Sequence, residues 1–213
     1  MILRELRSVS FPVTSTASIL LVATTNRGKL AEIRGMLAGL PYEIVALTDV
    51  ATVPEPDETG ETFEDNAREK ALYYAGASGL LTVAEDSGLE IDALDGAPGI
   101  QSARWHGTDY AVKFRRIYEL LDARGLATSA ARFVCALALA RGDRVLFEAR
   151  GAVEGEIARE PRGTHGFGYD PIFYYAPFGC TLGELEDDQK RAVSHRGAAF
   201  RQLAAHLAAH QRP

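Results

Sequence analysis

The segment at residues 81–92 (LTVAEDSGLEID) constrains the fold more than any other part of the sequence. An apolar, strand-like run ends there in two adjacent acids, Glu85 and Asp86, before a Ser-Gly pair. Burying a carboxylate is unfavourable unless it is paired, protonated or bound to a metal ion. The segment therefore predicts either a solvated turn after a core strand, with Gly88 at a positive φ, or a magnesium-dependent catalytic site.

The composition predicts a soluble globular protein, because 213 residues with 46% hydrophobic and 24% charged side chains can bury a sizeable core. The formal net charge of -6 argues against nucleic-acid binding through a basic surface. Cys135 and Cys180, the only cysteines, are far apart. A disulfide scaffold or zinc site is therefore not expected, and a reducing cytoplasm fits best.

The first 18 residues lack a continuous apolar core of signal-peptide length. We expect residues 1–18 to be a weakly ordered extension before one domain at residues 19–213. No apolar run approaches the roughly 20 residues that a membrane-spanning helix needs, so no membrane contact is expected.

Helical and strand-like patterns alternate along this domain. Strands are expected at residues 19–23, 43–47, 133–140, 145–157 and 172–175, with a turn at 142–143 joining two of them. Helices are expected from about residue 30 to 40, over 63–77 with Thr62 as N-cap, and over 110–121 and 200–210. Loops are expected at residues 53–60, 95–99 and 161–168. The order predicts an α/β fold with a mixed sheet.

The turn TTNRGK connects the first expected strand to a helix. Backbone amides at a helix N-terminus carry partial positive charge and can receive phosphate oxygens, to which Lys29 would add a full charge. The spacing is not that of a Walker P-loop, and taken alone the turn favours an ordinary strand-to-helix connection over a phosphate site. The chain has 19 Arg and only four Lys. Lysine suits single phosphate oxygens, which draws attention to Lys29 and Lys70.

An acidic loop offers Asp57 and Glu58, either of which could join Asp86 in holding a hard cation.

Further along, the glycines of GFGYDP would let the backbone approach a flat ligand, and Asp170 could accept a hydrogen bond from a ring N–H. A tight turn with its aromatics packed in the core is the alternative. Near the C-terminus, several donors precede the last helix and favour an anionic or carbonyl-bearing partner; they are Lys190, Ser194, His195 and Arg196.

Six motifs in order, TTNRGK, ETFEDNAREKA, AEDSGLEIDAL, APGIQSARW, GFGYDPIF and SHRGAAF, closely resemble the inosine triphosphate pyrophosphatase family. The resemblance covers residues 19–207. It implies a long mixed sheet flanked by helices, two lobes with a central active-site cleft, and a homodimer. It also implies magnesium-dependent hydrolysis of ITP, dITP and XTP to the monophosphate and pyrophosphate, which would cleanse the cytoplasmic nucleotide pool and keep these purines out of DNA and RNA.

The resemblance also assigns roles to residues. Asp86 would hold magnesium and act as the base toward water, with Asp57 or Glu58 completing the metal site. The expected substrate-binding residues are Thr24, Thr25, Asn26, Arg27, Gly28, Lys29, Lys70, Ser87, Phe167, Gly168, Tyr169, Asp170, Lys190, His195 and Arg196. Glu85 stands where the family commonly has a second Asp, which leaves its role open.

These roles agree with the chemistry of the purine edge. A 6-keto purine presents an acceptor at O6 and a donor at N1, whereas adenine presents an amino donor at position 6. Arg196 or His195 facing O6, with Asp170 facing N1–H, would reject adenine. Two alternatives remain, a Maf-like pyrimidine nucleotide pyrophosphatase and a non-catalytic nucleotide-binding protein. GFGYD and SHR argue against the former, and a water-activating acid at Asp86 argues against the latter.

Overall fold

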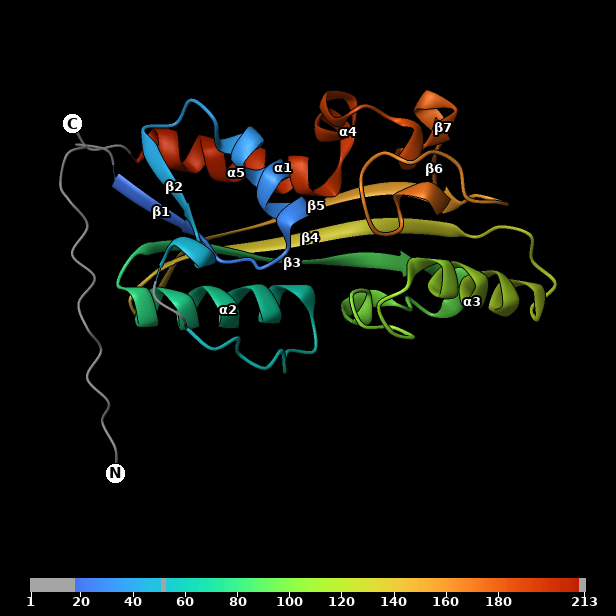
Figure 1. The fold of residues 1–213 in the computed structure, drawn as a ribbon, viewed down its shortest axis with the longest axis horizontal. Helices are drawn as coiled ribbons and strands as arrows, with labels where there is room; N and C mark the ends of the chain where they lie inside the picture. Colours follow the sequence, from blue (N-terminus) through green and yellow to red (C-terminus); the bar gives the residue numbers. More distant parts are fainter. Residues whose placement is uncertain (1–17, 51–52, 211–213) are drawn as a thin grey trace.

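The computed structural model describes residues 18–50 and 53–210. Strands form one mixed sheet in the order β2-β1-β3-β4-β5-β6-β7 (Figure 1). β1 pairs in parallel with β2 and β3, and the remaining neighbours are antiparallel. The strands are β1 (Ser18–Val22), β2 (Tyr42–Ala46), β3 (Leu81–Ile91), β4 (Ala130–Arg141), β5 (Arg144–Ile157), β6 (Phe173–Tyr175) and β7 (Cys180–Thr181). The mixed α/β sheet expected from the sequence is thereby confirmed. Of the extension expected at residues 1–18, residues 1–17 lie outside the described residues, and Ser18 begins β1.

Helices cover both faces of the sheet (Figure 1). They are α1 (Arg27–Leu37), α2 (Phe63–Ser78), α3 (Tyr110–Asp122), α4 (Asp187–Val193) and α5 (His195–Ala209). α1 and α5 bury apolar side chains with one face of β1, β3 and β4, whereas α2 packs against the opposite face of β3 and β4. α3 covers the far end of β3 on the side of α2 (Figure 1). Both faces of β3 are therefore shielded from water.

The acids of β3 are inside the strand, not at its end as the sequence predicted. β3 continues to Ile91, with Glu85 and Asp86 in register opposite residues of β4. Only 4% of Glu85 and 6% of Asp86 is exposed, so the alternative of a solvated turn is wrong as well. The local pattern could not show this, because the cations that stabilise these acids come from distant segments, as described below.

The C-terminal helix begins at His195 and not at the predicted Phe200. Ser194 is its N-cap and accepts a hydrogen bond from the Gly197 amide (3.0 Å). The same serine ends α4, a short helix that the sequence did not predict. Lys190 therefore lies in α4, and His195 and Arg196 form the first turn of α5 instead of preceding it.

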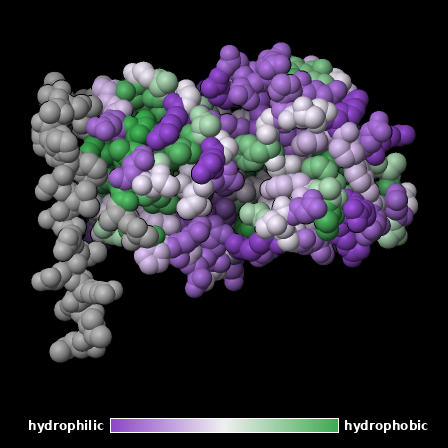
Figure 2. All heavy atoms as spheres, viewed as in Figure 1, coloured by the Kyte–Doolittle hydropathy of each residue, from purple (hydrophilic) through white to green (hydrophobic). Residues whose placement is uncertain are grey.

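The surface is uneven in polarity. Figure 2 shows hydrophilic residues over most of the right-hand part of this face and more hydrophobic ones at the left, toward the β2 edge of the sheet. Within the described ranges no helix is both long and apolar enough to span a bilayer.

Candidate active site

A cleft opens where β1 ends and its neighbour β3 continues. The pairing of β1 with β3 stops at Val22 and Val83, and the Ala23 amide donates the last backbone hydrogen bond to the Val83 carbonyl (2.8 Å). Beyond this point the edge of β3 that carries residues 85–87 has no strand beside it. Ligands of α/β sheets bind in crevices at such carboxyl ends of strands.

Residues 24–29 border this cleft; they form the loop after β1 and the first turn of α1, which begins at Arg27 and not near the predicted residue 30. Asn26 caps α1, because its Oδ1 accepts a hydrogen bond from the Lys29 amide (3.1 Å), and Thr24 Oγ1 accepts one from the Asn26 amide (3.2 Å). Thr24, Thr25, Asn26 and Lys29 line a cavity of about 540 Å³. The amides of a helix N-terminus and one lysine are thus placed beside the cavity, as anion binding requires.

Not every residue of the turn is brought to the cleft. Arg27 is exposed and lines neither this cavity nor the neighbouring one described below. Residues two apart on a helix do not face each other, so Arg27 and Lys29 point in different directions. Gly28 instead lies against Phe167, since a Cβ there would be 2.9 Å from the Phe167 ring.

Glu85 and Asp86 project from opposite faces of β3, because successive side chains of a strand alternate. Asp86 points toward α2, where Asn66 Nδ2 donates a hydrogen bond to its Oδ2 (3.1 Å) and Lys70 Nζ lies 3.4 Å from its Oδ1. Burial raises the pKa of Asp86, and the attraction of Lys70 and Lys29 offsets only part of this. Asp86 is therefore a carboxyl with increased proton affinity.

The acidic loop contributes Glu58 to the same group. Lys70 Nζ lies 2.7 Å from Glu58 Oε1, so one ammonium is shared between Glu58 and Asp86. Burial opposes ionisation of Glu58, but Lys70 and Arg104 outweigh it and lower its pKa. Asp57 also lines the cavity but is exposed. Geometry thus favours Glu58 over Asp57 as partner of Asp86.

These acids fit a hard divalent cation. The described residues contain no cluster of three or more His, Cys, Asp or Glu side chains that could hold a metal ion. Mg²⁺, however, is usually bound through one or two carboxylates together with substrate phosphates. Glu58 and Asp86 already share one cationic group, the Lys70 ammonium, so their oxygens face a position where positive charge is stabilised.

On the opposite face, Glu85 neutralises two cations. Lys29 Nζ lies 2.6 Å from Glu85 Oε1, and Arg196 Nη2 lies 3.6 Å from Oε2. Burial opposes ionisation of Glu85, but these two cations outweigh it and hold its pKa far below the usual range. The ionised form of Glu85 is thereby favoured, and it positions Lys29 and Arg196.

A second cavity adjoins the first and brings together segments that are distant in sequence. Asp170 Oδ2 accepts hydrogen bonds from the Phe167 amide and from Lys190 Nζ (both 2.7 Å). Arg196 donates to Ser87 Oγ (2.9 Å). The lining includes Ser87, Phe167, Gly168, Tyr169, Asp170, Lys190, His195 and Arg196. Residues lining both cavities are Asn26, Lys29, Ser87 and Ala103.

Two groups in this second cavity have no hydrogen-bond partner among the described residues although they are buried. They are His195 Nδ1 and Arg196 Nε. Burial and the nearby Arg196 keep the pKa of His195 well below its ordinary value, so its ring is neutral and offers one donor and one acceptor. Unpaired buried polar atoms are unfavourable, so these two atoms are available to pair with a bound ligand.

The two aromatics of GFGYDP differ in their placement. Phe167 is half-buried, with Lys190 Nζ 4.6 Å and Arg196 Cζ 5.6 Å from its ring centroid. Tyr169 is 3% exposed and its hydroxyl donates to the Ser102 carbonyl (2.9 Å). Phe167 is thus available to a flat ligand, whereas Tyr169 mainly packs in the core, as the alternative interpretation of this motif expected.

Sequence reasoning missed Glu32 of α1. Its carboxylate receives Lys190 Nζ (2.7 Å) and Arg196 Nη1 (2.5 Å), and so links α1 to α4 and α5. Burial opposes ionisation of Glu32, but Arg196 and Lys190 outweigh it and lower its pKa. No local signal distinguishes Glu32 from a solvent-exposed helical glutamate.

Sequence reasoning also missed the role of Asn66, although its position one helical turn before Lys70 was visible. Asn66 is 1% exposed, and besides its bond to Asp86 its Oδ1 accepts from the Gly60 amide (2.9 Å). Asn66 thereby fixes both the Asp86 carboxylate and the loop that carries Glu58.

Replacing Asn66 with Ala is expected to lower kcat for the ITP hydrolysis that the family resemblance implies about 10–100-fold, because Asp86 loses its orienting donor. Steady-state kinetics of the purified variant measure this. Gln202→Ala is a matched control, since Gln202 is an exposed helical amide that donates to the Arg150 carbonyl. Unchanged turnover in Asn66→Ala would contradict the positioning role.

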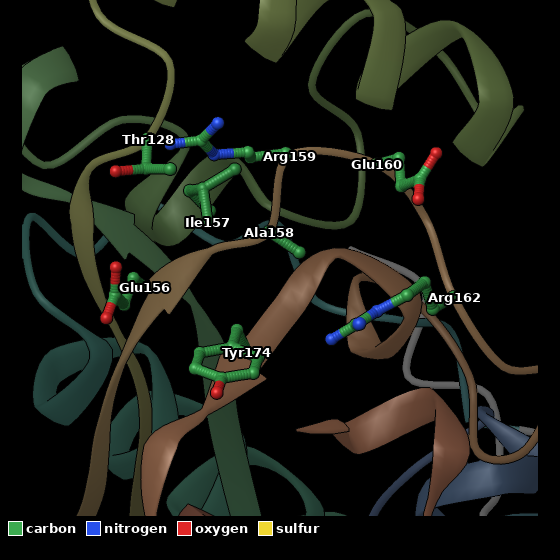
Figure 3. Close-up of a pocket in the computed structure, with 8 residues that line it drawn as sticks. All are labelled: Thr128, Glu156, Ile157, Ala158, Arg159, Glu160, Arg162 and Tyr174. Carbon is green, nitrogen blue, oxygen red and sulfur yellow. The ribbon is translucent and has the colours of Figure 1, made fainter. Parts of the chain in front are cut away.

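A third cavity, of about 320 Å³, lies apart from these residues. Figure 3 shows its lining by Arg159 and Arg162 together with Glu156, Glu160 and Tyr174. It contains none of the residues predicted from the sequence. Of these three cavities, the cleft beside Asp86 is the largest.

Comparison with known proteins agrees with the motifs. A sequence model of the Ham1 family matches residues 20–206. A dITP/XTP pyrophosphatase of Exiguobacterium sp. is 46% identical over 188 residues, covering 88% of this chain and 96% of the relative. One of Geobacter sulfurreducens is 44% identical over 191 residues, covering 88% and 96%.

Solved structures agree with the fold. A HAM1 protein from Coxiella burnetii superimposes with a TM-score of 0.83 at 41% identity, covering 90% of this chain and 99% of that one. The Ham1 protein of Staphylococcus aureus gives 0.82 at 33% identity, covering 91% and 100%. Because family model, relatives and folds all match over most of its length, the chain belongs to the Ham1 family.

Proposed function

We propose that this protein hydrolyses non-canonical purine nucleoside triphosphates (ITP, dITP and XTP) to the monophosphate and pyrophosphate, with Mg²⁺. The observation that carries the proposal is a pair of adjoining cavities, one with unpartnered polar groups and an aromatic ring, the other with acids and lysines. A purine base suits the cavity with the aromatic ring and unpartnered polar groups, and its phosphates suit the cavity with the acids and lysines. The names of the relatives, dITP/XTP pyrophosphatases, support it.

The cavity lined by Phe167, Asp170 and Arg196 suits a 6-keto purine. Phe167 stacks on the base, Arg196 Nε or the neutral His195 ring donates to O6, and Asp170 accepts N1–H. Adenine would place an amino group against these donors and leave buried groups unpaired. Sites built to hydrogen-bond a substrate group reject analogues that lack it by a factor on the order of 10⁴.

The cavity lined by Lys29, Lys70 and Asp86 suits the phosphates. The amides of residues 24–29 and Lys29 receive phosphate oxygens, and Lys70 balances charge on the departing pyrophosphate. Asp86 and Glu58 would hold the metal ion, which when bound neutralises phosphate charge and orients water. Asp86 accepts a proton of the attacking water, the water oxygen bonds to the α-phosphorus, the bond from that phosphorus to the bridging oxygen breaks, and pyrophosphate leaves. Cleavage at the α–β linkage is taken from the family resemblance.

Purified protein with Mg²⁺ is expected to release pyrophosphate from ITP, dITP and XTP at least about a hundredfold faster than from ATP, because adenine leaves the purine-reading groups unpaired. A coupled pyrophosphate assay over a panel that also includes GTP and modified pyrimidine triphosphates measures this.

The same panel separates the alternatives. Preference for modified pyrimidines would indicate a Maf-like enzyme, and binding of ITP without pyrophosphate release would indicate a nucleotide-binding protein. Equal kcat/KM for ITP and ATP would remove the purine-reading role of His195, Arg196 and Asp170. EDTA is expected to abolish the release, which tests the metal.

We also propose, from the resemblance, that the protein is a cytoplasmic homodimer that cleanses the nucleotide pool. Light scattering coupled to size exclusion would then give twice the chain mass of 23.1 kDa. A monomer mass would exclude the dimer. Unchanged dITP levels in cells that lack the gene would exclude the cleansing role.

A further inference from the structure

The segment at residues 97–106 (APGIQSARWH) has no role in the proposed reaction, yet it is firmly anchored at the cleft. Ser102 Oγ accepts from the Leu89 amide of β3 (2.9 Å) and donates to the Gly99 carbonyl (2.6 Å). The Ser102 carbonyl receives the Tyr169 hydroxyl (2.9 Å) and Lys113 Nζ (2.9 Å). A segment held by this many buried hydrogen bonds presents its side chains from a fixed backbone.

Gly88 explains how closely this segment approaches the catalytic strand. A Cβ at Gly88 would collide with Ser102 Oγ and lie 2.5 Å from the Gly99 carbonyl oxygen. Only glycine permits this contact two residues after Asp86. The backbone before Arg104 is therefore fixed directly beside the acid proposed as the base.

Arg104 projects from the anchored segment into the cavity that Asp86, Lys29 and Lys70 line. Its Nη1 lies 2.6 Å from Glu58 Oε2, and its Nε donates to Gln101 Oε1 (2.8 Å). The Arg104 side chain is 47% exposed, compared with 13% for Lys70, the other cation on Glu58. Arg104 is thus the partner of Glu58 that solvent and ligands reach more easily.

The cations of this cavity are paired with protein acids. Lys29 is paired with Glu85, Lys70 with Asp86 and Glu58, and Arg104 with Glu58. A triphosphate therefore shares each of these cations with an acid, unless that acid takes another partner. A divalent cation on Glu58 would compete with Arg104 for the same carboxylate and leave the guanidinium free.

We propose that Arg104 binds the terminal phosphates of the substrate, and that Glu58 holds this arginine until a divalent cation takes its place. The inference rests on the proposed function and adds a residue to it. Arg104 lines only the cavity assigned to the phosphates and not the one assigned to the base, which places it at the β- and γ-phosphates. A guanidinium suits this task, because it can donate two parallel hydrogen bonds to phosphate oxygens.

The test compares Arg104→Gln with Arg116→Gln. Arg116 is a matched control, since it is 43% exposed and also paired with a glutamate (3.1 Å), but it lines neither cavity. Isothermal titration with pyrophosphate and with inosine monophosphate, both in Mg²⁺, avoids turnover. Arg104→Gln is expected to weaken pyrophosphate binding about tenfold or more, as the loss of a charge-assisted hydrogen bond does, and to leave inosine monophosphate within about twofold.

A second measurement tests the role of Glu58. Without a divalent cation, Glu58→Gln is expected to strengthen pyrophosphate binding relative to the wild type. In the Arg104→Gln background the same substitution should strengthen it less, as measured by comparing Arg104→Gln with the double variant Glu58→Gln/Arg104→Gln. Equal strengthening in both backgrounds would overturn the holding role.

Pyrophosphate binding by Arg104→Gln that equals the wild type, in a protein that hydrolyses ITP, would overturn the phosphate role alone. Failure of the wild type to hydrolyse any nucleotide would instead overturn the proposed function.

Discussion

Replacing Asp86 with Asn is expected to lower kcat for ITP hydrolysis by about a thousandfold or more while leaving ITP affinity within about threefold, because general-base catalysis contributes about 10²–10⁴ in rate. Asn has the shape of Asp but cannot accept the proton of water, and it ligates a hard cation less well. The Asn66 amide and the Lys70 ammonium that surround this position remain. Steady-state kinetics and equilibrium binding of ITP measure the two effects separately.

The fold of this variant is expected to be preserved. Burial raises the pKa of Asp86, so its ionised form opposes folding near neutral pH, and a neutral amide removes that cost. The free energy of unfolding should therefore equal or exceed that of the wild type. Asp92→Asn is a control at the end of the same strand, where the acid is exposed and pairs with Arg132. Turnover retained in Asp86→Asn would remove Asp86 from the role of base.

Replacing Arg196 with Met is expected to lower the free energy of unfolding by about 3–5 kcal/mol, the usual effect of removing one partner of a buried ion pair. Arg196 is 2% exposed, and its guanidinium contacts Glu32, Glu85 and Ser87. Met retains much of the apolar stem but leaves two acids with less compensating charge. Urea unfolding followed by circular dichroism measures the change.

Two further variants show whether unpaired acids are the cause. Arg196→Met combined with Glu32→Gln should recover part of the lost stability, because one of the two acids is then neutral. Arg116→Met should change stability by less than about 1 kcal/mol, as expected for an exposed pair. A loss below about 1 kcal/mol in Arg196→Met would mean that water reaches Glu32 and Glu85.

Much of the fold could be predicted from local patterns. The hydrophobic periodicity of α3, the Thr62 cap of α2 and the hairpin of β4 and β5 are confirmed, because each depends on residues close in sequence. β3 was predicted too short, since two acids in a buried strand look like its end until the cations of α1, α2 and α5 are known. The start of α5 was predicted too late, because Ser194 both ends α4 and caps α5 and no loop separates the two helices.

The site residues differ in the same way: those in local motifs could be predicted, and those that depend on distant residues could not. Motifs identified Asp86, Lys29, Lys70 and the segments of the second cavity, and the structure places these side chains around one cleft. Glu32 could not be found, because its importance depends on Lys190 and Arg196, more than 150 residues away in sequence. The choice of Glu58 over Asp57 likewise required the direction of each side chain in a loop without regular structure.

The alternation of Glu85 and Asp86 has an evolutionary consequence. One peptide bond separates Glu85, which holds Lys29 and Arg196, from Asp86, which is assigned to water, and the two side chains lie on opposite faces of β3. In the proposed reaction, substitutions in α4 and α5 would therefore alter the base side of the site without moving Asp86. Insertion or deletion of one residue between Val83 and Glu85 would reverse both faces at once, so strand length is more constrained here than the side chains of α4 and α5.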